Sequence, residues 1–170
     1  RSTGRVDPNA IKKADRLFDA SWCSILTELL QNSRRAGARR IELSITKVSA
    51  STNTDDRCHS IVYRDDGCGV DDPQILLTLG SSKWDEKINR EDPAGMGFFC
   101  LGGIGATVKS KNWCVTLDSE VFTGAKEAKV FETERHIKGV EISFVVDLGW
   151  RGDETAIEAC RFTGMALVLN

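Results

Sequence analysis

Apolar residues recur at helical spacing in the first part of the chain. Residues 22–35 carry a stripe whose members lie three or four positions apart, namely Ile25, Leu26, Leu29 and Leu30. This spacing predicts a helix that buries one face, and Gly37 predicts its end. A shorter apolar stripe predicts a preceding helix that begins near Asp7 or Asn9 and ends at Phe18.

Apolar and polar residues then alternate, which predicts strands. Ile41, Leu43 and Ile45 alternate with polar neighbours within residues 39–48, and the polar stretch 49–57 connects them to a second strand at 59–64. Pro73, which follows Asp71 and Asp72, predicts the start of a helix that continues through residue 79. Further strands are expected at residues 113–117, 129–135 and 140–147, separated by turns that contain Gly124 and Gly139.

The order of these elements favours an α/β (α+β) fold. Helices come mostly first and adjacent strands mostly later, which favours a two-layer sandwich over a doubly wound parallel sheet. We expect a mixed, mainly antiparallel sheet covered on one face by helices. Residues 1–150 are expected to form one domain. Residues 151–170 form a C-terminal tail, either a short helix and strand or the start of a truncated second domain.

Composition is typical of a globular domain. The chain has 170 residues, 41% of them hydrophobic and 28% charged, and its net charge of −2 gives no broad attraction to nucleic acid or to an anionic membrane. No apolar run is long enough to cross a bilayer, so no membrane partner is expected. The chain begins at Arg1 rather than Met, which indicates a piece of a longer protein.

The six cysteines are scattered through the chain. None forms a Cys-x-x-Cys pair, and the two histidines offer no zinc-finger spacing. These cysteines therefore fit reduced thiols in a cytoplasmic protein better than a disulfide framework.

Two polar residues share a face of the long predicted helix. Glu28 and Asn32 lie four positions apart, so their side chains project from the same side. An amide oxygen suits Mg²⁺, and a glutamate can orient and deprotonate a water molecule. Taken alone, each is as well explained as a solvated helical side chain.

Glycines follow the second strand and recur later. Asp65 is followed by Gly67 and Gly69, an arrangement in which a carboxylate accepts a hydrogen bond from a flat ligand that the backbone approaches closely. Gly95 and Gly97 offer backbone amides to phosphate. Each fragment alone is also typical of a simple turn, and neither a phosphate loop nor a dinucleotide fingerprint is present.

The order of these fragments is more informative than any one of them. A helix with Glu-x-x-x-Asn, a strand pair, Asp-x-Gly-x-Gly and a later Gly-x-Gly together resemble the GHKL (Bergerat-fold) ATPase superfamily. The resemblance covers roughly residues 20–147, and residues 28–38 and 65–70 are closest in text to the MutL and Hsp-ninety-type branches. Arg35 and Val140 depart from the family pattern, which usually has an acidic residue and a threonine there.

The resemblance implies an ATP site with Mg²⁺, closed by a lid over residues 80–94. It implies Glu28 as the general base and Asn32 as the magnesium ligand. Asp65 would bind the adenine amino group. The other implied nucleotide contacts are Gly67, Gly69, Ser82, Lys83, Gly95 and Gly97.

The implied function is a Mg-dependent ATPase that couples nucleotide state to lid closure and association, with a possible ATP-dependent homodimer. A DNA or protein client would bind through regions outside this chain. Two alternatives remain open. One is an ATP-binding scaffold or sensing module with little hydrolysis, and the other is a histidine-kinase-like phosphotransfer domain, although neither His59 nor His136 lies in a recognisable phosphoacceptor helix.

Overall fold

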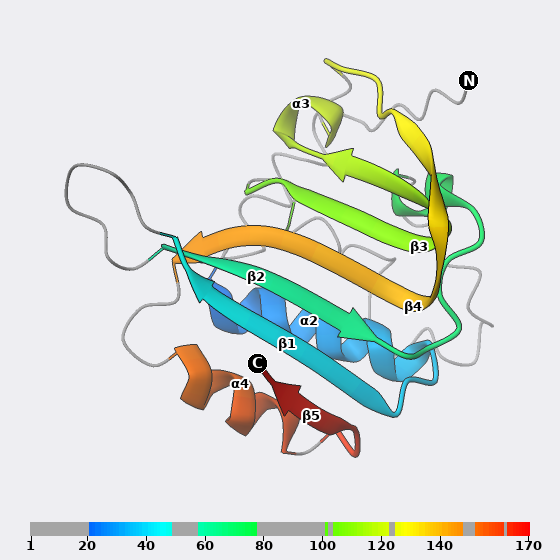
Figure 1. Ribbon diagram of the computed structural model, residues 1–170. Coiled ribbons are helices and arrows are strands. Elements are labelled where there is room, and N and C mark those ends of the chain that lie inside the picture. Colours follow the sequence, from blue (N-terminus) through cyan, green and yellow to red (C-terminus); the bar gives the residue numbers. More distant parts are fainter. Residues whose placement is uncertain are drawn as a thin grey trace, which may run out of the picture.

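The computed structural model describes residues 21–48, 58–77, 101, 104–122, 125–147, 152–161 and 163–170 (Figure 1). In chain order its elements are α2 (Trp22–Arg35), β1 (Arg40–Lys47), β2 (Cys58–Asp65), the 3-10 helix η1 (Pro73–Leu77), β3 (Ala106–Leu117), α3 (Ser119–Phe122), β4 (Val130–Asp147), α4 (Gly152–Cys160) and β5 (Ala166–Leu169). The helix predicted to end at Phe18 and the lid predicted over residues 80–94 lie outside the described residues.

Helix α2 has the bounds that its apolar stripe predicts. Ser21 caps its N-terminus, where its hydroxyl accepts a hydrogen bond from the Ser24 amide at 3.3 Å. At the other end Gly37 adopts a φ of 73°, and the amide of Ala38 donates to the Ser33 carbonyl at 2.9 Å. This is a Schellman ending, so the stop expected at Gly37 is confirmed.

The sheet has five strands in the order β3-β4-β2-β1-β5. Its β1–β2, β2–β4 and β3–β4 pairs are antiparallel, whereas β5 runs parallel to β1. Helix α2 crosses one face of this sheet (Figure 1), and α4 contacts both α2 and β5. The predicted α+β class, with a mixed and mainly antiparallel sheet covered on one face by helices, is confirmed.

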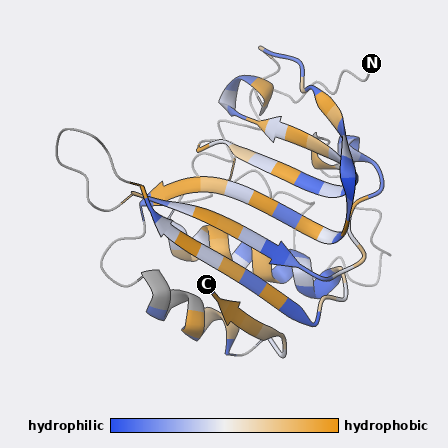
Figure 2. Cartoon of the chain, in the orientation of Figure 1, coloured by the Kyte–Doolittle hydropathy of each residue, from blue (hydrophilic) through white to orange (hydrophobic). Residues whose placement is uncertain are grey.

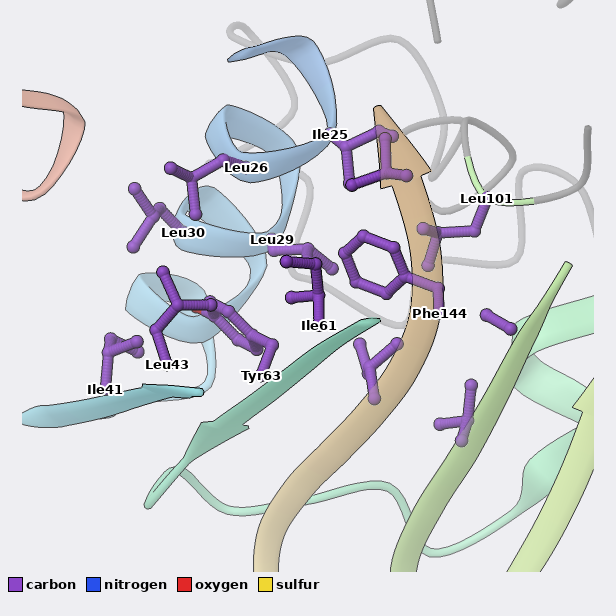
Figure 3. Packing of buried hydrophobic residues seen from close by; sticks show 14 of the residues in the cluster. Ile25, Leu26, Leu29, Leu30, Ile41, Leu43, Ile61, Tyr63, Leu101 and Phe144 are labelled. Carbon is purple, nitrogen blue, oxygen red and sulfur yellow. The ribbon is translucent and has the colours of Figure 1, made fainter. Parts of the chain in front are cut away.

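The core lies between α2 and the sheet. Alternating residues of β1 and β2 are buried beneath the helix, and Figure 2 shows alternating bands of hydropathy along β1. In Figure 3 the apolar stripe of α2 faces side chains from β1, β2 and β4. The fully buried members on these elements include Ile25, Leu26, Ile41, Leu43 and Ile61. Burial of each such side chain contributes about 1.5–3 kcal/mol, so this interface is a main source of stability.

Strands β3 and β4 differ from the sequence prediction. The Oγ1 atoms of Thr107 and Thr116 lie 3.1 Å apart, which a straight strand does not allow, so β3 reverses direction near Lys111, whose φ is 50°. The turn expected at Gly139 is wrong, because β4 continues through this residue, although its pairing with β3 shifts register between Val140 and Ile137. The helix expected from residue 73 is described as η1, a 3-10 helix.

The C-terminal tail forms a helix and a strand, as one of its two sequence interpretations predicts. Strand β5 pairs with β1 from Arg40↔Ala166 to Leu43↔Leu169, so the tail adds an edge strand to the same sheet. Where the domain ends stays a prediction. None of the helices in the described part of the chain is long and apolar enough to cross a membrane.

A charged row crosses the face of the sheet opposite to α2. Glu141 on β4 is buried, and its two carboxylate oxygens accept hydrogen bonds from Arg64 Nε at 2.6 Å and Lys109 Nζ at 2.8 Å. Burial raises the pKa of Glu141, but the hydrogen bonds and charges of these two cations outweigh it, so the net pKa lies below its ordinary value. The carboxylate therefore stays ionised and ties β2, β4 and β3 together.

This pKa shift predicts a pH-dependent stability. A carboxyl group with a lowered pKa in the folded state stabilises the fold above its ordinary pKa of 4.5, and this stabilisation is lost as pH falls through the lowered value. Glu141→Gln should reduce the free energy of unfolding at pH 7 by about 1–2 kcal/mol, a modest figure because the side chains of Arg64 and Lys109 are partly exposed. The difference from wild type should shrink in acid.

Urea unfolding at pH 7 and pH 3 measures both effects. Glu42→Gln is the control, because Glu42 lies on the same face but its ion pair with Arg40 is exposed. An equal loss in the two variants at pH 7, or a loss in Glu141→Gln that does not change with pH, would contradict the role of this ion-pair row.

Candidate functional site

The candidate site is built around Asp65, the last residue of β2. It lies two positions beyond Tyr63 and therefore shares the face of the strand that is turned toward α2. Its Oδ2 accepts a hydrogen bond from Ser33 Oγ at 2.7 Å, and its Oδ1 accepts from the amides of Gly67 at 3.0 Å and Val140 at 3.2 Å. The carboxylate is thus held from α2, from the loop after β2 and from β4.

Ser33 links Asp65 to the core. The hydroxyl groups of Ser33 and Tyr63 are 2.7 Å apart, and both residues are only 1% exposed. Burial raises the pKa of Tyr63 well above its ordinary range and outweighs the hydrogen bond with Ser33, which lowers this pKa, while the nearby charge of Asp65 adds a smaller increase. The phenol therefore stays neutral.

The loop after β2 is held on both sides. The amide of Cys68 donates to the Ala36 carbonyl at the end of α2, at 2.9 Å. On the other side the Val70 amide donates to Ser110 Oγ at 2.9 Å, and Trp113 Nε1 donates to the Val70 carbonyl at 2.9 Å. This loop is therefore fixed between the helix and strand β3, which places Gly67 beside Asp65 and Gly69 beside Ser110 and Gly139.

Neighbouring Asp66 fixes the start of β1. Its Oδ1 accepts hydrogen bonds from the amides of Arg39 at 2.7 Å and Arg40 at 2.9 Å. These two backbone bonds lower the pKa of Asp66. The two successive aspartates thus have different tasks, since Asp66 joins two strand ends and Asp65 faces the helix.

Internal packing accounts for three glycines near Asp65. A Cβ atom on Gly67 would lie 2.8 Å from the Ala36 Cβ, and one on Gly69, whose φ is 72°, would lie 2.7 Å from Ser110 Oγ. A Cβ on Gly139 would lie 2.1 Å from the Asp65 carbonyl oxygen. The glycines of the Asp-x-Gly-x-Gly fragment are therefore required by the protein itself, and their contact with a ligand stays a prediction.

Glu28 and Asn32 border the buried stripe of α2. Both are half-buried, and Asn32 immediately precedes Ser33 and so lies in the helical turn that contacts Asp65. The Oε2 atom of Glu28 is buried and accepts no hydrogen bond from the described residues, although the side chain has other interactions. The structure thus brings the candidate base and metal ligand onto the helix that holds Asp65.

Four predicted contacts are not located. Ser82, Lys83, Gly95 and Gly97 lie outside the described residues. In the part of the chain that is described, no cluster of three or more His, Cys, Asp and Glu side chains could hold a metal ion. The amide oxygen of Asn32 nevertheless suits Mg²⁺, which commonly takes one or two protein ligands and completes its shell with water and phosphate.

Sequence reasoning missed three partners of Asp65. These are the Ser33 hydroxyl, the Val140 amide and, through Ser33, the Tyr63 hydroxyl. The positions of Ser33 and Tyr63 on buried faces could have been recognised in the sequence. Ser33 lies four positions after Leu29 on the buried face of the helix, and Tyr63 lies two positions before Asp65 on the inward face of its strand.

Comparison with known proteins supports the fold. No family model and no curated protein matches the chain. The crystal structure of the N-terminal domain of a DNA repair protein matches with a TM-score of 0.52 and 19% sequence identity, over 90% of this chain and 44% of that one. The chain therefore spans less than half of the matched structure, and at this identity the likeness shows a shared fold alone.

The close approach of Gly139 to Asp65 predicts a large effect of a single methyl group. Gly139→Ala should lower the free energy of unfolding by about 1–3 kcal/mol or more, because the new Cβ overlaps a backbone oxygen that cannot rotate away. Urea denaturation measures this loss. Gly164→Ala is the control, since its Cβ meets nothing within 4 Å and only its φ of 73° adds strain, about 1 kcal/mol. A smaller loss at Gly139 than at Gly164 would contradict the packing described here.

Proposed function

We propose that this chain is the ATP-binding, ATP-hydrolysing domain of a GHKL-type ATPase. The observation that carries the proposal is the Asp65 carboxylate, fixed by Ser33, Gly67 and Val140 beside the helix that bears Glu28 and Asn32. A rigid acceptor beside a helix that offers a candidate base and an oxygen ligand suits a nucleotide whose base and phosphates are recognised separately. The confirmed two-layer fold is compatible with this family but does not identify it.

Each residue then has a defined task. Asp65 accepts a hydrogen bond from the exocyclic amino group of adenine, because all of its described partners are donors and it remains an acceptor. Glu28 orients a water molecule and accepts its proton during attack on the γ-phosphoryl group. Asn32 contributes an amide oxygen to Mg²⁺. This ion, when bound, would neutralise charge on the phosphates.

Val140 stands where the family usually has a threonine, but this difference leaves a hydrogen bond from residue 140 to Asp65 in place. The side chain lacks a hydroxyl group, but its backbone amide donates to Asp65 Oδ1 at 3.2 Å. Loss of one neutral hydrogen bond from a threonine hydroxyl costs about 0.5–1.5 kcal/mol. Ligand binding is therefore weakened rather than abolished by this difference.

The rest of the proposal concerns regulation and partners. ATP binding would close the segment at residues 80–94 and promote an ATP-dependent homodimer in the cytoplasm, with a DNA or protein client bound elsewhere. The matched structure belongs to a DNA repair protein, which makes DNA the first client to test. A scaffold that binds ATP with little hydrolysis is the second candidate, because the three hydrogen bonds that fix Asp65 as an acceptor do not depend on hydrolysis.

Calorimetric titration with ATP, with and without Mg²⁺, tests nucleotide binding. Wild type should bind Mg-ATP, and Asp65→Asn should weaken binding roughly 10- to 100-fold because a charged acceptor is replaced by an amide. Asp71→Asn is the matched control, since the Asp71 side chain is 93% exposed. Absence of binding by the wild type would end the proposal, and equal binding by both variants would remove Asp65 from the site.

Glu28→Ala tests hydrolysis separately from binding. Loss of a general base should lower the rate of phosphate release at least roughly 100-fold, while the calorimetric affinity for Mg-ATP stays within a few-fold of wild type. Gln31→Ala, an exposed position on the same helix, should leave both unchanged. If Glu28→Ala hydrolyses ATP at the wild-type rate, another residue is the base. If wild type binds ATP without measurable turnover, the scaffold function is favoured.

A further inference from the structure

The hydrogen bonds around Ser33 have only one consistent direction. Ser33 Oγ donates its single proton to Asp65 Oδ2, so it has no proton left for Tyr63. The contact of 2.7 Å between Ser33 Oγ and Tyr63 Oη must then have the tyrosine as donor. Tyr63, Ser33 and Asp65 therefore form a chain of hydrogen bonds that runs outward from the core.

Burial keeps this direction fixed. Both hydroxyl groups lie on residues that are 1% exposed, so water does not compete for their protons. Burial, and to a smaller extent the charge of Asp65, raise the pKa of Tyr63, so the phenol stays protonated and remains a donor at neutral pH. The direction of these hydrogen bonds is therefore fixed, because Ser33 gives its one proton to the Asp65 carboxylate and has none to donate to the phenol.

Three donors leave Asp65 with little choice of ligand. Oδ1 already accepts two hydrogen bonds, from Gly67 and Val140, whereas Oδ2 accepts one, from Ser33. Each carboxylate oxygen has two lone pairs, so Oδ2 retains an acceptor position. A ligand group that meets this position must bring a proton, because a carbonyl oxygen there would face an unshared lone pair.

We propose that Tyr63 is a positioning residue which, through Ser33, holds Asp65 as an acceptor and so makes the site select a purine with a 6-amino group over one with a 6-keto group. This inference rests on the proposed function and deepens it by naming a specificity determinant that does not touch the ligand. Without the phenol, Ser33 gains a free choice of orientation and Asp65 loses its fixed third donor.

A purely structural role for Tyr63 makes a different prediction. A buried tyrosine needs a hydrogen-bond partner, and Ser33 satisfies that need whatever Asp65 does. In that case Tyr63→Phe would change stability or weaken all nucleotides equally. The positioning role instead changes the ratio of two affinities, which a general loss of packing does not move.

The experiment compares ATP with inosine triphosphate by calorimetry in wild type and in Tyr63→Phe. Wild type should prefer ATP at least roughly 100-fold, because the 6-keto group of inosine leaves Asp65 without a donor. Tyr63→Phe should reduce this preference roughly 5- to 10-fold, mainly through weaker ATP binding, and Ser33→Ala should reduce it by at least as much. Thr27→Ala removes a hydroxyl from the exposed side of the same helix, where it bonds the Cys23 carbonyl, and should leave the preference unchanged.

Asp65→Asn tests the same series of hydrogen bonds by placing a donor at residue 65 in place of an acceptor. An amide nitrogen at this position can donate to Ser33 Oγ, so the hydrogen bond between residues 33 and 65 reverses its direction. The remaining amide proton faces the ligand. The variant should therefore prefer inosine triphosphate over ATP, and a variant that keeps the ATP preference would overturn the inference.

The outcomes separate the two levels of the proposal. A wild-type chain that binds neither nucleotide overturns the proposed function and this inference with it. A wild-type chain that binds ATP, together with a Tyr63→Phe variant whose ATP preference equals that of wild type, overturns the inference and leaves the proposed function standing. A reduced preference in Tyr63→Phe and Ser33→Ala, with Thr27→Ala unchanged, supports it.

Discussion

The arrangement of the site depends on the carboxylate of Asp65. It is where three parts of the chain meet, because its partners come from α2, from the loop after β2 and from β4. Each of these contacts satisfies a polar group of the protein near the core, where an unsatisfied donor costs about 1–3 kcal/mol. The candidate site and the fold are therefore coupled, because the proposed ligand acceptor is also a residue that aligns the helix with the sheet.

The close approach of β4 to Asp65 explains why residue 139 is a glycine. Gly139 is followed by an apolar strand, and a glycine in such a place predicts a turn. In the structure β4 continues through it, and a side chain there would overlap the backbone of Asp65. The glycine thus reflects a contact between strands, and its absent Cβ allows the next amide, that of Val140, to reach Oδ1.

Short-range periodicity predicted much of this architecture. Helix α2 and strands β1 and β2 agree with their hydrophobic patterns because each buries one face against the same core. The same periodicity places Ser33 and Tyr63 on inward faces, although it does not show that their hydroxyl groups meet. The reversal of β3 could not be predicted, since Lys111 adopts a positive φ without being a glycine and is held by a bond from its Nζ to the Cys68 carbonyl. Such features depend on contacts between residues far apart in the chain, which no local pattern contains.

The buried carboxylate of Glu141 and the half-buried carboxylate of Asp65 have different partners, which explains why the first is structural and the second suits a ligand. Glu141, on the face away from α2, accepts from two cations, so its charge is neutralised within the protein. Asp65, on the face toward α2, is held by a hydroxyl and two backbone amides, all of them neutral donors. Neutral donors fix the position of a carboxylate without pairing its charge with a cation, and in a partly buried setting the remaining acceptor position interacts more strongly than it would in water. The alternation of β2, which sends Arg64 to one face and Asp65 to the other, therefore separates the cation that would neutralise the site from the acceptor that forms it.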